Sequence, residues 1–157
     1  MEVRYECKVA VFLILTRIKD GKTEVLLQKR INTGYMDGKY DAAASGHLEK
    51  GESVSMAVVR EAKEEINIDI EEKDLKFVQL IHPYQEGYVN VFFTTDKYKG
   101  NPEIMEGDKC EDLSWFNISE LPDNIIPRIK NVLKNIELGI LYDDGDFSQQ
   151  QYKSKNN

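Results

Sequence analysis

The chain has 157 residues, 41% of them hydrophobic, and its formal net charge is −7 from 21 basic and 28 acidic side chains. That length is enough for one domain with a hydrophobic core of its own. The acidic balance, with no long cluster of Lys or Arg, argues against a nucleic acid polymer or a membrane as partner. Cys7 and Cys110 fit neither a zinc site nor a disulfide framework, so a cytoplasmic location is expected.

The first third of the chain predicts a β-hairpin followed by a long loop. Residues 5–15 are rich in β-branched and aromatic side chains, Asp20 and Gly21 supply a turn, and residues 24–30 predict the second strand. Residues 31–46 have no helical period and contain several turn formers, so they predict a loop with at most short strand pieces. Loops of this length often carry function.

A helix is predicted from about residue 53 to 66. Its apolar residues share one face at helical spacing, and they are Val54, Ala57, Val58, Ala62 and Ile66. The segments expected after it are strands at 75–82 and 88–95, a polar loop, a short strand at 113–116 and a second helical region over 118–139. Residues 1–142 are thus predicted to form a single domain, and residues 143–157 a polar, flexible tail.

The first predicted helix carries three carboxylates at or within its apolar face. Glu61 and Glu65 project from that face and Glu64 lies at its edge. Like charges one turn apart repel each other, and a divalent cation with hard oxygen ligands, such as Mg²⁺, would remove the repulsion. The alternative is a solvated acidic face on which Arg60 pairs with Glu64.

The segment containing this helix resembles the Nudix box of the MutT/Nudix hydrolases. The family pattern is Gly, five residues, Glu, seven residues, then Arg-Glu-aliphatic-x-Glu-Glu-x-Gly-aliphatic. The matching residues over positions 46–68 are Gly46, Glu52, Arg60, Glu61, Glu64, Glu65, Ile66 and Ile68. Asn67 replaces the late Gly, and Ala62 is smaller than usual. Because Asn tolerates the left-handed conformation at a helix end, we expect Asn67 to keep the geometry that Gly provides.

The resemblance implies a Nudix fold, which is an α/β/α sandwich around a mixed, mostly antiparallel sheet. It implies Mg²⁺ as cofactor, for which Mn²⁺ can substitute. Glu64 and Glu65 are the implied metal ligands, and Glu61 is implied to ligate the metal or to activate water. The backbone carbonyl of Ser45 or Gly46 is the remaining implied inner ligand.

Glu52 and Arg60 complete the implied catalytic set. Glu52 corresponds to a carboxylate that supports metal-bound waters, and Arg60 to a residue that orients the carboxylates through salt bridges. The family reaction is attack of water on a phosphorus of a nucleoside diphosphate linked to another group.

Residues outside the box carry weaker signals. Arg30, at the end of the second predicted strand, could meet a substrate phosphate. Tyr40 could contact the base of a nucleotide, with Tyr35 as the competing position. For each of them the alternative is a solvated side chain without a ligand.

A further acid is implied opposite the box. Glu111, four residues before Trp115, resembles the extra metal ligand or base that many relatives contribute from a loop, and Glu106 and Asp108 are alternatives. His47 and His82 are expected to satisfy local hydrogen bonds, since neither has a second His spaced to help it bind metal.

The function predicted from the sequence is a Mg²⁺-dependent nucleotide pyrophosphohydrolase that cleaves a nucleoside triphosphate, modified or not, to the monophosphate and pyrophosphate. Hydrolysis of ADP-ribose or of a nucleotide sugar is the first alternative. A non-catalytic domain that senses a nucleotide is the second, and the intact set of Glu residues argues against it. The predicted partner is a small nucleotide, and the sequence leaves open a monomer or a homodimer.

Overall fold

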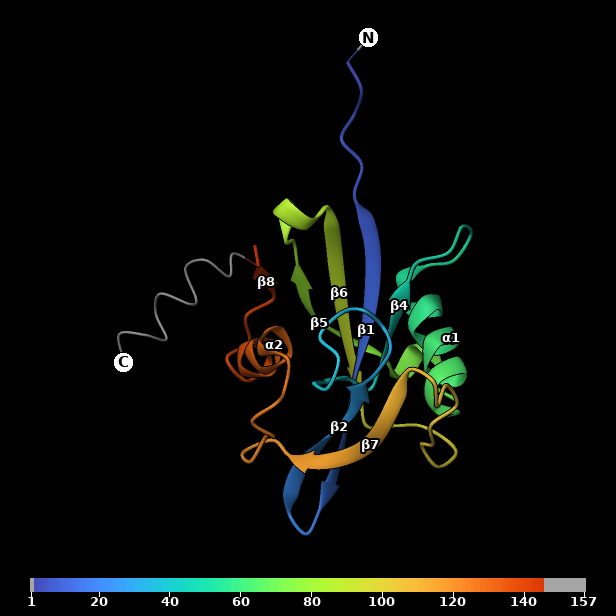
Figure 1. The fold of residues 1–157 in the computed structure, drawn as a ribbon, viewed down its shortest axis with the longest axis vertical. Coiled ribbons are helices and arrows are strands. Elements are labelled where there is room, and N and C mark those ends of the chain that lie inside the picture. Colours follow the sequence, from blue (N-terminus) through green and yellow to red (C-terminus); the bar gives the residue numbers. More distant parts are fainter. Residues whose placement is uncertain (1, 146–157) are drawn as a thin grey trace, which may run out of the picture.

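The structure is a computed structural model that describes residues 2–145 (Figure 1). Its strands are β1 (Lys8–Lys19), β2 (Lys22–Arg30), β3 (Tyr40–Ala42), β4 (Ala44–His47), β5 (Lys76–Ile81), β6 (Tyr88–Thr95), β7 (Cys110–Asn117) and β8 (Tyr142–Asp143). Its helices are α1 (Val54–Ile66), α2 (Pro127–Glu137) and the short 3₁₀ turns η1 (Glu72–Asp74) and η2 (Tyr84–Glu86). None of the helices within residues 2–145 is long and apolar enough to cross a membrane.

The eight strands form one mixed sheet in which most neighbours are antiparallel, as predicted. The order is β3-β2-β1-β6-β5-β8, with β4 paired to β1 and β7 paired to β2. Strand β1 runs parallel to β6, and β5 runs parallel to β8, while the other pairs are antiparallel.

The two helices cover opposite faces of this sheet, which confirms the predicted α/β/α sandwich (Figure 1). Successive side chains of β1 alternate between the faces. Val11, Leu13 and Leu15 pack in the core beneath α1. Phe12 and Ile14 pack with the side chains of α2 in the second core. The helices therefore cannot meet each other, and each one shapes its own side of the molecule.

The hairpin between β1 and β2 is confirmed, with longer strands than predicted. Asp20 and Gly21 both have positive φ angles, 51° and 74°, as a two-residue turn of type I′ requires. The pairing continues down to Lys19 and Lys22, so β1 extends beyond its expected end at residue 15. It also begins later than expected, because the segment before residue 8 has no strand partner among the described residues.

Three further boundaries differ from those expected. Strand β7 has twice the length of the predicted segment 113–116 because it follows β2 over most of that strand. Helix α2 begins only at Pro127, where the fixed φ of proline suits a first helical position. The predicted boundary at 142/143 falls inside β8, where Asp143 pairs with Ile81 of β5. The rest of the predicted tail, residues 146–157, lies outside the described residues.

Candidate active site

Both ends of α1 are set by the residues that the sequence indicated. Ser53 caps the first turn, where its Oγ accepts a hydrogen bond of 3.2 Å from the Met56 amide. Asn67 adopts the left-handed conformation with φ 55°, and its amide donates to the carbonyl of Lys63 at 3.2 Å. The prediction that Asn67 can replace the family's Gly is confirmed in its backbone geometry.

The strand β4 brings its backbone against two carboxylates of α1. The amide of Ser45 donates to Glu65 Oε2 at 2.8 Å. A Cβ atom added to Gly46 would collide with the carboxylate of Glu61, so any larger residue at this position would displace that carboxylate. The structure thus places Ser45, Gly46, Glu61 and Glu65 together, although Gly46 and Glu61 are 15 positions apart in the chain.

Arg60 holds the other box carboxylates in place. Its Nε and Nη2 form a bidentate pair with Glu52 at 3.0 and 2.7 Å. Its Nη1 donates to Glu61 Oε1 at 2.7 Å and to Glu64 Oε2 at 3.3 Å, and its Nη2 also reaches the carbonyl of His47 at 3.1 Å. A guanidinium offers five donors in a rigid fork, so one residue can orient three carboxylates. The geometry agrees with the orienting role implied for Arg60.

The protonation of the buried carboxyls differs from that of an ordinary surface Glu. Burial raises the pKa of Glu65 to about 8, and the charges of Glu61, Glu106 and Asp41 act in the same direction while the Ser45 amide opposes them. In the absence of a cation, the Glu65 carboxyl group therefore keeps its proton at neutral pH.

The pKa values of Glu61 and Glu52 shift in opposite directions, although both side chains contact the guanidinium of Arg60. Burial raises the pKa of Glu61, although Arg60 opposes this shift. Hydrogen bonds from Arg60 lower the pKa of Glu52, which therefore remains an anion at neutral pH. Three box carboxylates thus have three distinct electrostatic environments.

The donor set suits a hard divalent cation, yet its oxygen atoms have other partners in this structure. Carboxylates and backbone carbonyls are the ligands that Mg²⁺ prefers. Within residues 2–145, no three His, Cys, Asp or Glu side chains converge in a metal-binding arrangement. Arg60 holds Glu61 and Glu64, and the Ser45 amide holds Glu65. We conclude that the chemistry of these residues fits the cation and that Arg60 compensates their charge here.

The loop before β7 places Glu106, rather than Glu111, near these carboxylates. This loop lies against the end of α1, where the Met105 amide donates to the carbonyl of Glu65 at 3.2 Å. The charge of Glu106 raises the pKa of both Glu61 and Glu65. Glu111 instead forms a 3.0 Å salt bridge with Lys29 on the neighbouring strand β2. Among the three acids considered, the geometry favours Glu106 as the one beside the box.

Arg30 and Tyr40 both have structural partners. Arg30 Nη1 donates to Asp41 Oδ2 at 2.9 Å, and its Nε donates to the carbonyl of Tyr35 at 2.8 Å. The Tyr40 hydroxyl donates to Asp112 Oδ2 at 2.6 Å, and burial together with this bond raises the pKa of Tyr40 to about 12. Arg30 therefore orders the loop that follows it, and the Tyr40 hydroxyl is bound to β7.

Asp41 is a buried acid that the sequence analysis missed. Its side chain is only 5% exposed, it accepts from Arg30, and it also accepts from the Ala42 amide at 2.7 Å. Burial raises its pKa, while Arg30 and Arg128 oppose the shift. The only feature near it in the sequence is the run of three alanines that follows. An Asp beside small residues is also common in turns, so this pattern did not indicate burial.

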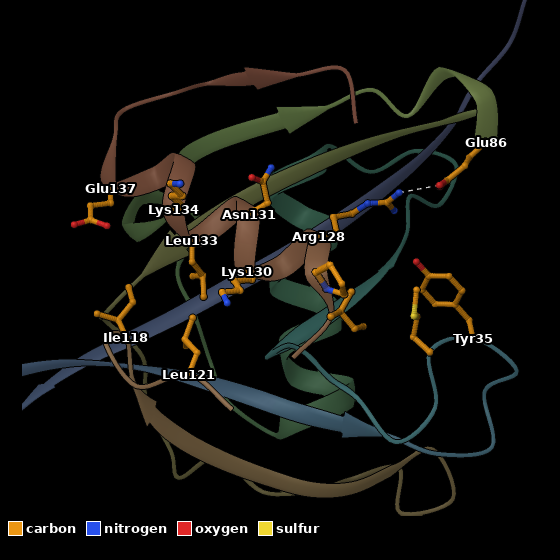
Figure 2. Close-up of a pocket in the computed structure, with 13 residues that line it drawn as sticks. Tyr35, Glu86, Ile118, Leu121, Arg128, Lys130, Asn131, Leu133, Lys134 and Glu137 are labelled. Atoms are coloured by element: carbon orange, nitrogen blue, oxygen red, sulfur yellow. Dashed lines mark hydrogen bonds and ion pairs between the residues drawn. The ribbon is translucent and has the colours of Figure 1, made fainter. Parts of the chain in front are cut away.

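A cleft of about 760 Å³ runs along α2, on the face of the sheet away from α1 (Figure 2). Tyr35 and Met36 form one end of the lining, and Ile118 and Leu121 form the other. None of the box residues lines this cleft, and Tyr35 is the only lining residue that the sequence had suggested for substrate contact.

Comparison with known proteins identifies the family of this chain from its sequence. A family model described as the NUDIX domain matches residues 8–136. The NAD-capped RNA hydrolase NudC of Pseudomonas fluorescens is 29% identical over 112 residues, which are 71% of this chain and 37% of that protein. The NAD-capped RNA hydrolase NudC of Pseudomonas entomophila is 31% identical over 100 residues, which are 63% of this chain and 34% of that protein. The chain thus spans about a third of the length of these relatives.

Solved structures of low sequence identity share the fold. The MutT NUDIX hydrolase from Burkholderia pseudomallei superposes with a TM-score of 0.70 at 24% identity, covering 82% of this chain and 96% of that one. The NUDIX domain of Shewanella oneidensis NrtR, solved in complex with ADP ribose, superposes with a TM-score of 0.67 at 16% identity, covering 87% of this chain and 89% of that one.

Proposed function

The chain belongs to the Nudix family, and we propose that it is a Mg²⁺-dependent pyrophosphohydrolase that cleaves a nucleoside diphosphate linked to a second group. The single observation that carries the proposal is the contact between β4 and α1. The backbone at Ser45 and Gly46 meets the carboxylates of Glu65 and Glu61 so closely that a side chain at position 46 would displace the Glu61 carboxylate. A merely solvated acidic face would not require this contact.

The residues that would hold the cation are Glu61, Glu64, Glu65 and the backbone carbonyl of Ser45 or Gly46. When bound there, Mg²⁺ lowers the pKa of a water molecule and neutralises charge on the phosphate oxygens. Arg60 orients the carboxylates, and Glu52 fixes Arg60 through the bidentate pair. Glu61, whose pKa is raised by burial, can accept a proton at a carboxylate oxygen.

Two substrate classes fit this chemistry. The first is a nucleoside triphosphate, cleaved to the monophosphate and pyrophosphate. The second is ADP-ribose or another nucleoside diphosphate with a bulky group, and it is supported by the relatives named as NAD-capped RNA hydrolases and by the fold shared with a domain that was solved with ADP ribose. The complete set of box acids favours an enzyme over a non-catalytic sensor.

We propose a free nucleotide rather than a nucleic acid polymer as the ligand, and a cytoplasmic site of action. The net charge of −7 would repel a polyanionic chain. Cys7 and Cys110 are both free thiols, in keeping with a reducing compartment.

The test is hydrolysis of a nucleotide panel by the purified full chain with Mg²⁺ or Mn²⁺. The panel contains the common triphosphates, ADP-ribose, NAD⁺ and a nucleotide sugar, and products are identified after reaction in ¹⁸O-water. We expect cleavage between two phosphorus atoms, loss of turnover with chelator, and release of a nucleoside monophosphate. Release of orthophosphate alone, or turnover that chelator leaves unchanged, would contradict the proposal.

A further inference from the structure

Residues 99–106, which we call the acid loop, lie between β6 and β7 and against the end of α1 (Figure 1). A helix ends with carbonyl groups that no helical amide reaches. Here the carbonyl of Ile66 accepts a hydrogen bond of 3.1 Å from the Glu103 amide, and the carbonyl of Glu65 accepts one of 3.2 Å from the Met105 amide. The acid loop therefore completes the C-terminal end of the helix that carries the proposed metal ligands.

A second backbone contact fixes the start of the acid loop. Lys99 and Asp69 exchange two backbone hydrogen bonds of 3.0 Å, as residues of an antiparallel pair do. Gly100 follows with a φ of 96°, a conformation that favours glycine, and a Cβ added there would lie 3.3 Å from the carbonyl oxygen of Asn67. The loop therefore runs close to Asn67 from its first residues onward.

The side chain of Asn67 adds a tether that glycine cannot make. Its Nδ2 donates a hydrogen bond of 2.6 Å to Glu103 Oε1. A hydrogen bond to a carboxylate is charge-assisted and stronger than one between neutral groups. The Nudix box pattern has Gly at this position, and Gly would keep the left-handed backbone but would lose the donor. The departure of this chain from the pattern thus adds a contact between the end of α1 and the acid loop.

The tethered residues immediately precede Glu106, the acid that the loop places near the box. Met105 is its neighbour in the chain, and Glu103 lies three positions before it. On the other side, the carbonyl of Glu106 accepts hydrogen bonds of 2.9 and 3.0 Å from the amides of Lys109 and Cys110, where β7 begins. Glu106 is therefore held between the end of α1 and the start of β7.

We propose that Asn67 is a positioning residue of the active site: by holding Glu103, its side chain keeps Glu106 close to the box carboxylates, where Glu106 helps to hold the cation. This inference rests on the proposed function and adds Asn67 and Glu103 to its machinery. The bond between them is exposed, so its contribution to global stability is small. What it changes is the fraction of molecules in which the acid loop is docked, and the apparent affinity for a cation is reduced by that fraction.

Hydrogen exchange in the metal-free full chain measures how firmly the loop is docked. We expect the Met105 amide to exchange about threefold faster in Asn67→Gly than in the wild type, since one exposed hydrogen bond has that order of effect on local opening. Glu103→Ala should give the same increase. The double variant should exchange no faster than either single variant, because both substitutions remove the same bond. Glu103→Gln keeps a side-chain oxygen as acceptor and should restore most of the protection.

Titration with Mn²⁺ in the absence of nucleotide shows whether the tether acts through Glu106. We expect Asn67→Gly to raise the Kd for Mn²⁺ about twofold, and Glu106→Gln to raise it about tenfold. In the Glu106→Gln background, Asn67→Gly should have no further effect, because the carboxylate that it positions is gone. A purely structural role of Asn67 would weaken binding equally in both backgrounds.

The matched control for the loss of charge at Glu103 is Glu120→Ala. Glu120 is an exposed acid in the turn after β7, outside the acid loop. We expect this variant to leave both the exchange of the Met105 amide and the Kd for Mn²⁺ unchanged.

The outcomes distinguish this inference from the proposed function. If the Met105 amide exchanges equally in Asn67→Gly and the wild type, or if Asn67→Gly raises the Kd equally in both backgrounds or in neither, Asn67 does not position Glu106, whereas the hydrolase function stands. If the exchange and Mn²⁺ results are as expected but no nucleotide is hydrolysed, the proposed function fails and the positioning of Glu106 stands. If the wild type does not bind Mn²⁺, both fail.

Discussion

The two faces of the sheet differ in how their functional residues are brought together. On the α1 face, the box residues lie within 21 positions of one another, from Ser45 to Glu65, and a single helix carries four of them. On the α2 face, the cleft combines Tyr35, Glu86, Ile118 and Arg128, which come from four separate segments of the chain.

This difference teaches that the two surfaces are encoded at different ranges in this protein. The carboxylates of the box are positioned by helical spacing and by one arginine on the same helix. The lining of the cleft along α2 depends on how a loop, a 3₁₀ turn and a helix meet after the chain has folded. Mutations on the first face should therefore abolish turnover.

The largest expected effect is on the α1 face. Combining Glu64→Gln with Glu65→Gln should lower kcat by about 10³-fold or more, because two proposed ligands of the cation lose their charge together. The fold should remain intact, since Glu65 keeps its proton at neutral pH in the metal-free protein and the side chain of Glu64 is exposed. Steady-state kinetics and thermal unfolding in chelator measure the two effects. Turnover that survives both substitutions would refute the assigned metal site.

Gly46→Ala should damage the same face through packing alone. The added Cβ would displace the Glu61 carboxylate, so we expect a clear fall in kcat and a loss of no more than about 1 kcal/mol in the free energy of unfolding. The matched control is Gly107→Ala, where a Cβ has no heavy atom within 4 Å and φ is not positive. Steady-state kinetics and denaturant unfolding of both variants provide the comparison. Equal kcat values for Gly46→Ala and Gly107→Ala would argue against the β4–α1 contact.

The stability of the metal-free protein should fall as pH rises through neutrality. The pKa of Glu65 is about 8 in the folded chain and near its model-peptide value, about 4.3, when unfolded. Between these values the folded state retains a proton that the unfolded state has released, so stability decreases with pH by at most about 1.4 kcal/mol per unit. Below the lower value, or above the higher one, this contribution does not change with pH.

Unfolding measured in chelator from pH 5 to 9 tests that slope. The Glu65→Gln variant is the control, because its amide does not titrate and its profile should be flatter. Saturating Mg²⁺ should also reduce the slope, since a carboxylate must be deprotonated to ligate a metal. A wild-type profile that rises from pH 5 to 8 in chelator would contradict the burial of an acid at position 65.

The smallest expected effect is at the end of α1. Asn67→Gly should change stability by less than about 0.5 kcal/mol, because Gly also adopts the left-handed conformation seen at this position. The change also removes a hydrogen bond of 2.6 Å from Asn67 Nδ2 to Glu103, which is exposed and contributes little. Ala disfavours the left-handed conformation, so Asn67→Ala should lower the free energy of unfolding by about 1 kcal/mol. Equal losses in the two variants would mean that the side chain matters more than the backbone conformation.

The sequence by itself determined the parts of this protein that depend on neighbours along the chain. The hairpin turn at Asp20 and Gly21, the start of α1 near Ser53 and the left-handed end at Asn67 were all predicted and confirmed, since each depends on conformational preferences within a few residues. The same holds for the grouping of Glu61, Glu64 and Glu65 on one side of a helix, which follows from its period of 3.6 residues.

Only the tertiary structure decided the contacts between distant segments. Nothing near Glu111 in the sequence indicates its pairing with Lys29, 82 positions earlier, or that Glu106 would be the acid beside the box. The burial of Asp41 and the pairing of β8 with β5 likewise appear only when the sheet is assembled. These contacts depend on strand register and loop path, which are set by packing of the whole core rather than by local preference.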